Sequence, residues 1–274
     1  MQLVGMIGSA LMLGHLLEDY SHGQLIRVVQ AVAVMTLVLN VIALWKQEPR
    51  SRLRKPGTPL EQNFQQAWQT FCQGPHTLRR LLVVGFGTMA FTMEDVLLEP
   101  YGGEMLNLSV SSTTLLTATL AVGGLMGFAW ASRVLSRGGD AYHMARYGAW
   151  VGVPAFVAVI AAPLLGSSWI FALGIFLVGM GGGIFAHGTL TATMQLAPAD
   201  QTGLAMGAWG AVQATAAGIG MALGGVLRDG IALISNSFMG YSSVYLLEMV
   251  LLAMTLVAMR PLTRGAASVR QPSA

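Results

Sequence analysis

The sequence has few charged residues and a single cysteine. Only 10% of the 274 residues are charged, whereas a typical soluble domain has about 25%. This scarcity, together with a mean hydropathy of +0.61, excludes a soluble enzyme, a disordered tail and a nucleic-acid-binding protein. The lone Cys72 excludes an intramolecular disulfide and a cysteine-based metal cluster. The net charge of +3 is too small to indicate a polyanionic partner, so the composition predicts an integral membrane protein.

Eight apolar stretches are long enough to cross a bilayer, which needs about 20 residues per helix. The expected spans cover approximately residues 1–17, 24–45, 81–98, 111–132, 145–165, 167–196, 202–227 and 241–259. With the N-terminus inside, all of the 15 lysines and arginines except Arg27 and Arg228 lie in inner loops or in the C-terminal tail. Because inner loops are enriched in basic residues, both termini are expected in the cytoplasm.

The spans divide the chain into four parts. Residues 1–45 hold two helices, residues 46–80 form a basic cytoplasmic linker, residues 81–259 hold six helices and residues 260–274 form a tail. Within the linker, Thr58 and Pro59 begin an expected amphipathic helix that Gly74 and Pro75 end. This helix is expected to lie in the membrane interface and to pack against the bundle, although it could also be a docking site for a partner.

Small residues recur every fourth position in the expected span 202–227. The pattern comprises Gly203, Gly207, Gly210, Gly218, Gly220 and Gly224. Shorter repeats, Gly123 with Gly127 and Gly179 with Gly183, occur in other spans. Small residues at this spacing let helix backbones approach closely in lipid, so residues 202–227 are expected to form a central helix that is packed on two sides.

Acidic residues at membrane depth are the first functional candidates, because burying a charge there is costly. They form an expected polar cluster of Glu94, Asp95, Glu99 and Glu248, with Glu104 nearby. The cluster could be a proton or cation relay, or a polar anchor for a partner. A solvated acidic rim at the outer surface accounts for Glu99 and Glu104 but explains Glu94 and Asp95 less well.

A histidine inside an expected span is the second candidate. His187 has small and hydroxyl-bearing neighbours, so it is either a hydrogen-bonded packing residue or a metal ligand, including a ligand of the magnesium in a chlorin ring. No HExxH motif, no GxSxG motif and no serine–lysine arrangement occurs. The sequence therefore predicts no catalytic residue and no metal site of the protein's own.

Several stretches resemble known families. Residues 127–138 (GFAWASRVLSRG) are similar to the inner-loop motif of the major facilitator superfamily, with Gly127, Arg133, Arg137 and Gly138 in place and the acidic member missing. Residues 91–104 (FTMEDVLLEPYGGE), 187–194 (HGTLTATM) and 203–218 (GLAMGAWGAVQATAAG) resemble the PucC/LhaA family. Residues 224–229 (GGVLRD) and 40–49 (NVIALWKQEP) do so as well, and the resemblance covers nearly the whole chain.

The resemblance implies a major-facilitator-like, all-α integral membrane bundle. It implies the last two helices of the N-terminal half and a complete six-helix C-terminal half, without the first four helices. It also implies an assembly factor for light-harvesting antenna complexes in the inner or photosynthetic membrane of a bacterium. Such a factor would not be an enzyme.

The expected partners follow from that role. They are the lipid bilayer, antenna polypeptides and bacteriochlorophyll or its synthesis machinery, with bacteriochlorophyll carried as cargo and no nucleic acid bound. His187 is then the leading expected pigment ligand, and Gln213 is the second. The alternative is a major-facilitator-type secondary transporter of a small solute or ion.

Overall fold

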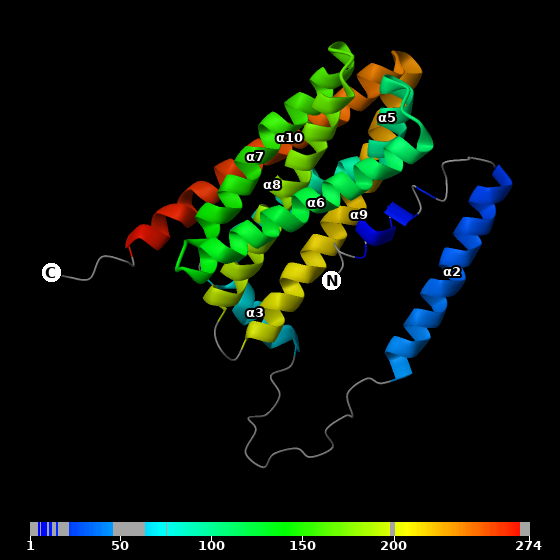
Figure 1. The fold of residues 1–274 in the computed structure, drawn as a ribbon. Helices are drawn as coiled ribbons and strands as arrows, with labels where there is room; N and C mark the ends of the chain where they lie inside the picture. Colours follow the sequence, from blue (N-terminus) through cyan, green and yellow to red (C-terminus); the bar gives the residue numbers. More distant parts are fainter. Residues whose placement is uncertain are drawn as a thin grey trace.

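The computed structural model of the chain is a bundle of long helices (Figure 1). It describes residues 5, 7–9, 11, 12, 15, 22–45, 64–74, 76–197 and 201–268, and none of these lies in a strand. The helices are α2 (His22–Trp45), α3 (Phe64–Cys72), α4 (Thr77–Thr92), the 3-10 turn η1 (Met93–Val96), α5 (Leu98–Leu106), α6 (Val110–Ser136), α7 (Ala141–Leu164), α8 (Ser168–Leu196), α9 (Thr202–Ile234) and α10 (Ser237–Ser268).

The five helices from α6 to α10 are each long and apolar enough to cross a membrane. The segment from α4 to α5 makes a sixth span if its two parts, bent by 50°, are counted together. These six agree with six of the eight expected spans, and the all-α integral membrane fold is confirmed. The expected span 24–45 is helical as α2, with an apolar stretch from Ile26 to Ile42, whereas most of residues 1–17 and the start of the amphipathic helix at Thr58 lie outside the described residues.

Capping residues at the N-termini and glycines in the turns mark the ends of several spanning helices. Ser109, Asp140 and Ser167 each precede a helix, and their side-chain oxygens accept hydrogen bonds from the backbone N–H of Ser112, His143 and Ile170, respectively. Such caps satisfy donors that a helix start leaves free. Gly138 and Gly166 adopt positive φ angles of 87° and 59° in the turns after α6 and α7, a conformation that glycine adopts at little cost.

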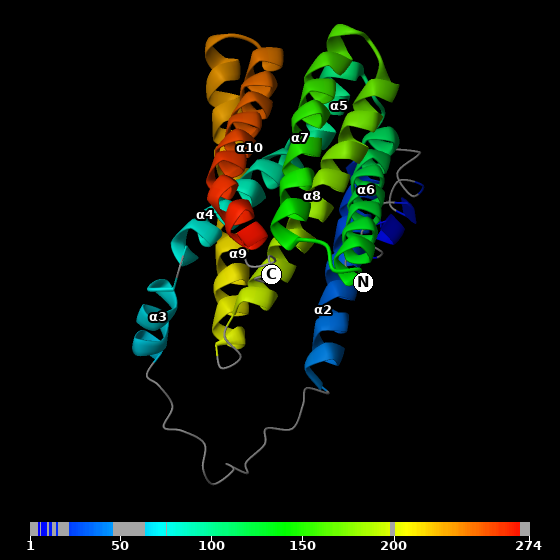
Figure 2. The same cartoon turned by 90° about the vertical axis from the view of Figure 1, so that its left-hand side faces the viewer.

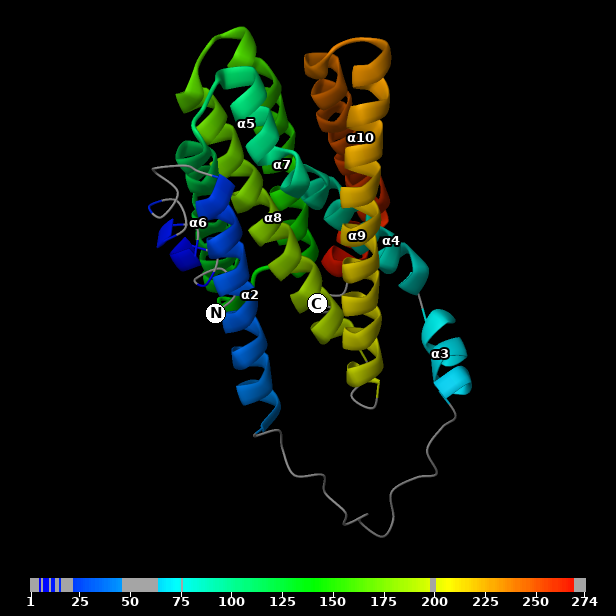
Figure 3. The same ribbon diagram turned by 90° about the vertical axis from the view of Figure 1, so that its right-hand side faces the viewer.

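The helices form two groups of three. In one group α8 packs against both α6 and α7, and in the other α4, α9 and α10 pack against one another. Figures 2 and 3 show the two groups standing side by side, with the α4–α5 segment crossing between them. The contact of α10 with α7 also joins the groups, so α8 and α10, rather than α9, occupy the interior of the described bundle.

Glycines bring α6 and α8 almost into backbone contact. A Cβ atom added at Gly127 would overlap the carbonyl oxygen of Met180, and one added at Gly179 would overlap that of Leu120. Gly123 and Gly183 show the same kind of contact across the same interface. The close packing expected from these four glycines is therefore present. Gly127 belongs to the interior of α6, which corrects its expected place in an inner-loop motif. Arg133 also lies on α6, and only Arg137 and Gly138 belong to the turn.

The glycines of α9 differ from the expectation. A Cβ atom at Gly203, Gly207, Gly210 or Gly218 would meet no atom within 4 Å, so these four do not pack against a helix of the described chain. Further along the helix Gly220 and Gly224 do pack, against Met89 and Met93 of the α4–η1 segment. The apolar window of α9 is only 11% buried, against 39–44% for the other four long helices, because α9 uses one face and leaves its small-residue face open.

Candidate functional site

A break in the helix places an acidic residue inside the bundle. α4 ends at Thr92, whose Oγ1 donates a hydrogen bond to the carbonyl oxygen of Thr88, a local bond that bends helices. Pro100 cannot donate a backbone hydrogen bond, and its ring clashes with a helical carbonyl four residues earlier. The α-helix is therefore interrupted by the 3-10 turn η1, and Glu94 lies on this turn. Broken spans of this kind line the substrate sites of transporters.

Glu94 and Glu248 form a buried acidic pair. Both residues have no accessible surface, and they are close enough to interact electrostatically across the η1–α10 contact. None of their four carboxylate oxygens has a side-chain hydrogen-bond partner, and the backbone of Glu94 lies close to the Glu248 carboxylate. The hydroxyl of Tyr245, which is also fully buried, has no partner either and lies in the field of both carboxyls.

If both carboxyl groups were ionised, the pair would be unfavourable in this interior of low polarity, because a buried charge needs a partner. Chemically, the pair is suited to holding a proton, a cation or a hydrogen-bond donor of a ligand. Of the expected polar cluster, Glu94 and Glu248 come together inside the bundle, and Asp95 lies close enough to act electrostatically on both. Glu99 is exposed and accepts a hydrogen bond from Thr117 Oγ1 at 2.9 Å.

A cavity of about 580 Å³ opens beside Glu94, and we call it the central cavity. Its lining comprises Phe91, Glu94, Leu120, Ala121, Gly124, Leu125, Phe128, Val178, Gly179, Gly182, Gly183, Ala186 and Gln213. The walls are apolar except for Glu94 and Gln213, and this combination is usual for small-molecule sites of 300–1,000 Å³. The α6–α8 glycines form one wall, so close helix packing also shapes the cavity.

The two expected pigment ligands differ in their position relative to the central cavity. Gln213 of α9 lines the central cavity itself. His187 of α8 does not, but its ring lies 4.1 Å, centroid to centroid, from the ring of Phe128, which does line it. The Nδ1 atom of His187 is buried without a hydrogen-bond partner. Gln213 therefore reaches the cavity directly, whereas His187 reaches it only through Phe128.

A second ionic cluster at the opposite end from α3 was not foreseen. Arg228 donates hydrogen bonds to Glu104 at 2.7 and 2.8 Å, to Asp229 at 2.7 Å and to the hydroxyl of Tyr241 at 2.9 Å. These bonds join α5, α9 and α10. The only available signal in the sequence was that Arg228 falls on the outer side of the expected topology, where a basic residue is uncommon.

Below this cluster, aromatic rings fill the space above the acidic pair. Tyr101 is fully buried, donates a hydrogen bond to the carbonyl oxygen of Val159 and contacts the rings of Phe171, Tyr241 and Tyr245. Among the described residues, no group of three or more His, Cys, Asp or Glu side chains is arranged to hold a metal ion. The site therefore consists of the acidic pair, the central cavity, and the residues Gln213 and His187 beside it.

Comparison with known proteins agrees with this architecture. The PUCC protein family matches residues 1–267. The chain is 56% identical over 235 residues to Protein PucC of Rhodovulum sulfidophilum, covering 84% of this chain and 52% of that protein. It is 48% identical over 274 residues to Protein PucC of Cereibacter sphaeroides, covering 98% and 60%. It is also 28% identical over 240 residues to the bacteriochlorophyll synthase 44.5 kDa chain of Rhodobacter capsulatus, covering 84% and 54%.

The chain thus spans between half and two thirds of the length of these relatives. The match to the family nevertheless extends over almost the whole of the chain. The chain belongs to the PUCC protein family.

Proposed function

We propose that this chain acts in the assembly of light-harvesting antenna complexes and that it holds bacteriochlorophyll in the central cavity while doing so. The observation that carries the pigment part is the cavity itself, which is apolar, about 580 Å³ in volume and bordered by Glu94 and Gln213. Membership of the PUCC family supports the assembly role. The name of one relative, which mentions bacteriochlorophyll synthase, supports the choice of pigment.

The residues beside the cavity suit a magnesium-bearing chlorin. The Gln213 amide oxygen and the imidazole of His187 are both able to ligate a metal or accept a hydrogen bond, and Nδ1 of His187 has no other partner. Phe91 and Phe128 supply flat apolar surface for a ring. In this proposal the protein binds its cargo, the antenna polypeptides and the bilayer, and it catalyses no reaction.

The first experiment is an absorption spectrum of the chain purified in mild detergent from a pigment-producing bacterium. We expect a chlorin band that co-purifies with the wild-type chain and is weakened in Gln213→Leu and His187→Ala. Gln195→Leu and His143→Ala are matched controls, because both side chains are exposed and lie away from the cavity. A spectrum without chlorin absorption, from a folded wild-type chain, would overturn the pigment part of the proposal.

The assembly role is tested separately in the same organism. Deleting the gene is expected to lower the near-infrared absorption of the antenna, and restoring the chain on a plasmid is expected to recover it. Unchanged antenna absorption after deletion would contradict an assembly role even if the purified chain carried pigment.

One observation favours a second candidate, a secondary transporter. The buried pair Glu94 and Glu248 lies beside the cavity, and intramembrane acids of this kind mark proton and cation pathways. Proton flux is measurable in vesicles that contain the purified chain and a pH-sensitive dye under an imposed membrane potential. Flux that requires both carboxyls, compared in Glu94→Gln, Glu248→Gln and the exposed control Glu99→Gln, would favour the transporter.

A further inference from the structure

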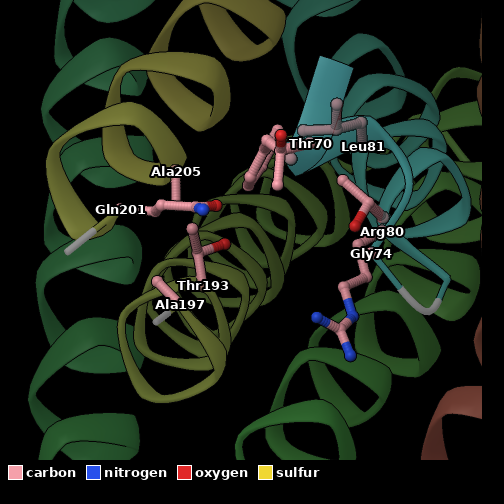
Figure 4. Close-up of a pocket in the computed structure, with 10 residues that line it drawn as sticks. Thr70, Gly74, Arg80, Leu81, Thr193, Ala197, Gln201 and Ala205 are labelled. Carbon is pink, nitrogen blue, oxygen red and sulfur yellow. The ribbon is translucent and has the colours of Figure 1, made fainter. Parts of the chain in front are cut away.

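A second pocket lies at the basic end of the bundle, where Arg79, Arg80, Arg133 and Arg137 are found. This inner pocket has a volume of about 360 Å³ and is bounded by α3, α4, the end of α8 and the start of α9. Figure 4 shows Thr193, Ala197 and Gln201 on one side of it, and Thr70, Gly74, Arg80 and Leu81 on the other. It is separate from the central cavity, with which it shares no lining residue.

Arg80 gives the inner pocket a fixed positive charge. Its Nε atom is buried and has no hydrogen-bond partner, although an arginine is always charged and has five N–H donors. The ion pairs of the described residues involve Arg228 and His143, and not Arg80. The charge of Arg80 acts on the hydroxyl of Tyr142, on which Asp140 acts as well, but Asp140 pairs with His143 and forms no ion pair with Arg80. An unpaired buried donor is costly to leave unmet, so the Nε atom of Arg80 is open to an anionic ligand.

Two helix starts add to this positive potential. Thr77 is the first residue of α4 and Gln201 immediately precedes α9, and both line the pocket. Neither helix has a side-chain cap, and neither carries an acidic residue in its first turn. A helix start bears partial positive charge that suits an anion, although the N–H of Thr77 itself already donates to the carbonyl oxygen of Gly74. None of the described lining residues is an aspartate or a glutamate.

The rest of the lining is apolar. Phe71, Leu81, Ala197 and Ala205 face the same space as the polar groups. The volume is about twelve times the roughly 30 Å³ that one water occupies in the liquid, so the pocket has room for a tetrahedral anion together with part of an apolar body.

From these observations we propose that the inner pocket binds a phosphate group, with Arg80 as the pairing cation and the starts of α4 and α9 as additional donors. The phosphate comes either from a phospholipid headgroup of the adjacent leaflet or from a soluble phosphate. Binding at this position joins α3 and α4 to the end of α8 and the start of α9.

Direct binding measurements on the full chain separate the two sources. One arm titrates delipidated chain in detergent with inorganic phosphate by calorimetry. The other arm measures retention of phosphatidylglycerol against diacylglycerol, which lacks the phosphate, by native mass spectrometry. Retention of phosphatidylglycerol without calorimetric binding of phosphate identifies the lipid, and binding in the calorimeter identifies the soluble ion.

Variants assign the binding to Arg80. We expect Arg80→Gln to weaken binding at least about tenfold, as for loss of a charge-assisted hydrogen bond. Arg79→Gln removes the same charge from the neighbouring, exposed position and is expected to bind as the wild type does. Equal binding by these two variants, or no binding in either arm by the wild type, overturns the proposal.

A second variant keeps the test decisive if Arg80→Gln fails to fold. Ala197→Phe leaves Arg80 in place and fills the half-buried far side of the pocket, so it is expected to abolish binding by exclusion. Undiminished binding by a folded Ala197→Phe chain would place the phosphate elsewhere and contradict the proposal.

Discussion

At the scale of single residues, the acidic pair is the feature that most limits stability. Glu94 and Glu248 are fully buried, and no side chain donates a hydrogen bond to their carboxylate oxygens. Residues that natural selection would discard for stability alone persist at functional sites, where the surrounding fold compensates for them. We therefore expect the two carboxyl groups to be needed for the function of the site and to lower the stability of the fold.

Glu248→Gln is expected to raise the melting temperature of the purified chain. The amide cannot carry a negative charge, and its N–H groups serve as donors for the free oxygens of Glu94. Each kcal/mol gained corresponds to about 2–4 °C in a chain of this size. The exposed control Glu99→Gln is expected to change the melting temperature little. A lower melting temperature for Glu248→Gln would mean that the carboxyl stabilises the fold.

Arg228 is expected to contribute through its partner Glu104. A double-mutant cycle with Arg228→Ala and Glu104→Ala, followed by thermal unfolding, is expected to give a coupling of about 1 kcal/mol, modest because Glu104 is 43% exposed. The two substitutions would be additive if the hydrogen bonds between them contributed nothing.

The sequence singled out Glu94 and Glu248 as acids inside spans, though not as partners of each other, and it did not indicate the Arg228 cluster. An acid inside a span stands out on its own, because burial there is costly wherever its partner lies. Arg228 and Glu104 are 124 positions apart, and a charged residue at the end of a span does not indicate which partner it has. Only the folding of α5 against α9 and α10 makes them neighbours.

At the scale of helices, glycine has two different roles in this chain. Gly127 sits where α6 touches the backbone of α8, whereas Gly207 lies on the open face of α9. The repeat of small residues every fourth position predicted the first interface correctly. It could not distinguish the second case, because the spacing is the same whether or not a neighbour is present.

Alanine substitution separates the two roles. Gly127→Ala is expected to lower the free energy of unfolding by more than about 2 kcal/mol, because the new methyl group meets backbone that cannot move aside. Gly207→Ala meets no atom and is expected to be neutral or to stabilise by up to about 1 kcal/mol, from helix propensity alone. Thermal unfolding in detergent measures both. A similar loss for the two variants would mean that the open face of α9 is covered in the purified protein.

At the scale of the whole molecule, the positions of the turns define a topology that is open to test. The positive-inside rule places the turn at Gly138 in the cytoplasm, and the turn at Gly166, one span later, on the other side. This orientation came from the distribution of basic residues, and it stays a prediction for the folded chain.

Alkaline phosphatase, which is active only outside the cytoplasm, reports the orientation. An insertion after Gly166 is expected to be active, and insertions after Gly138 or at Ala274 are expected to be inactive. Green fluorescent protein at the same three sites should give the opposite pattern. Activity at Gly138 would invert the topology and move the inner pocket to the opposite leaflet.

The break at η1 also has a consequence for how the chain enters the membrane during synthesis. α4 has 16 residues and α5 has nine, and at 1.5 Å per residue neither reaches across a hydrocarbon core of about 30 Å. The contacts of α4 with α9 and α10, and the bonds from Arg228 to Glu104 of α5, depend on residues that the ribosome adds more than a hundred positions later. Before then α5 has α6 as a packing partner, and α4 has α8. We therefore expect the α4–α5 segment to reach its final position only when the last two helices are inserted.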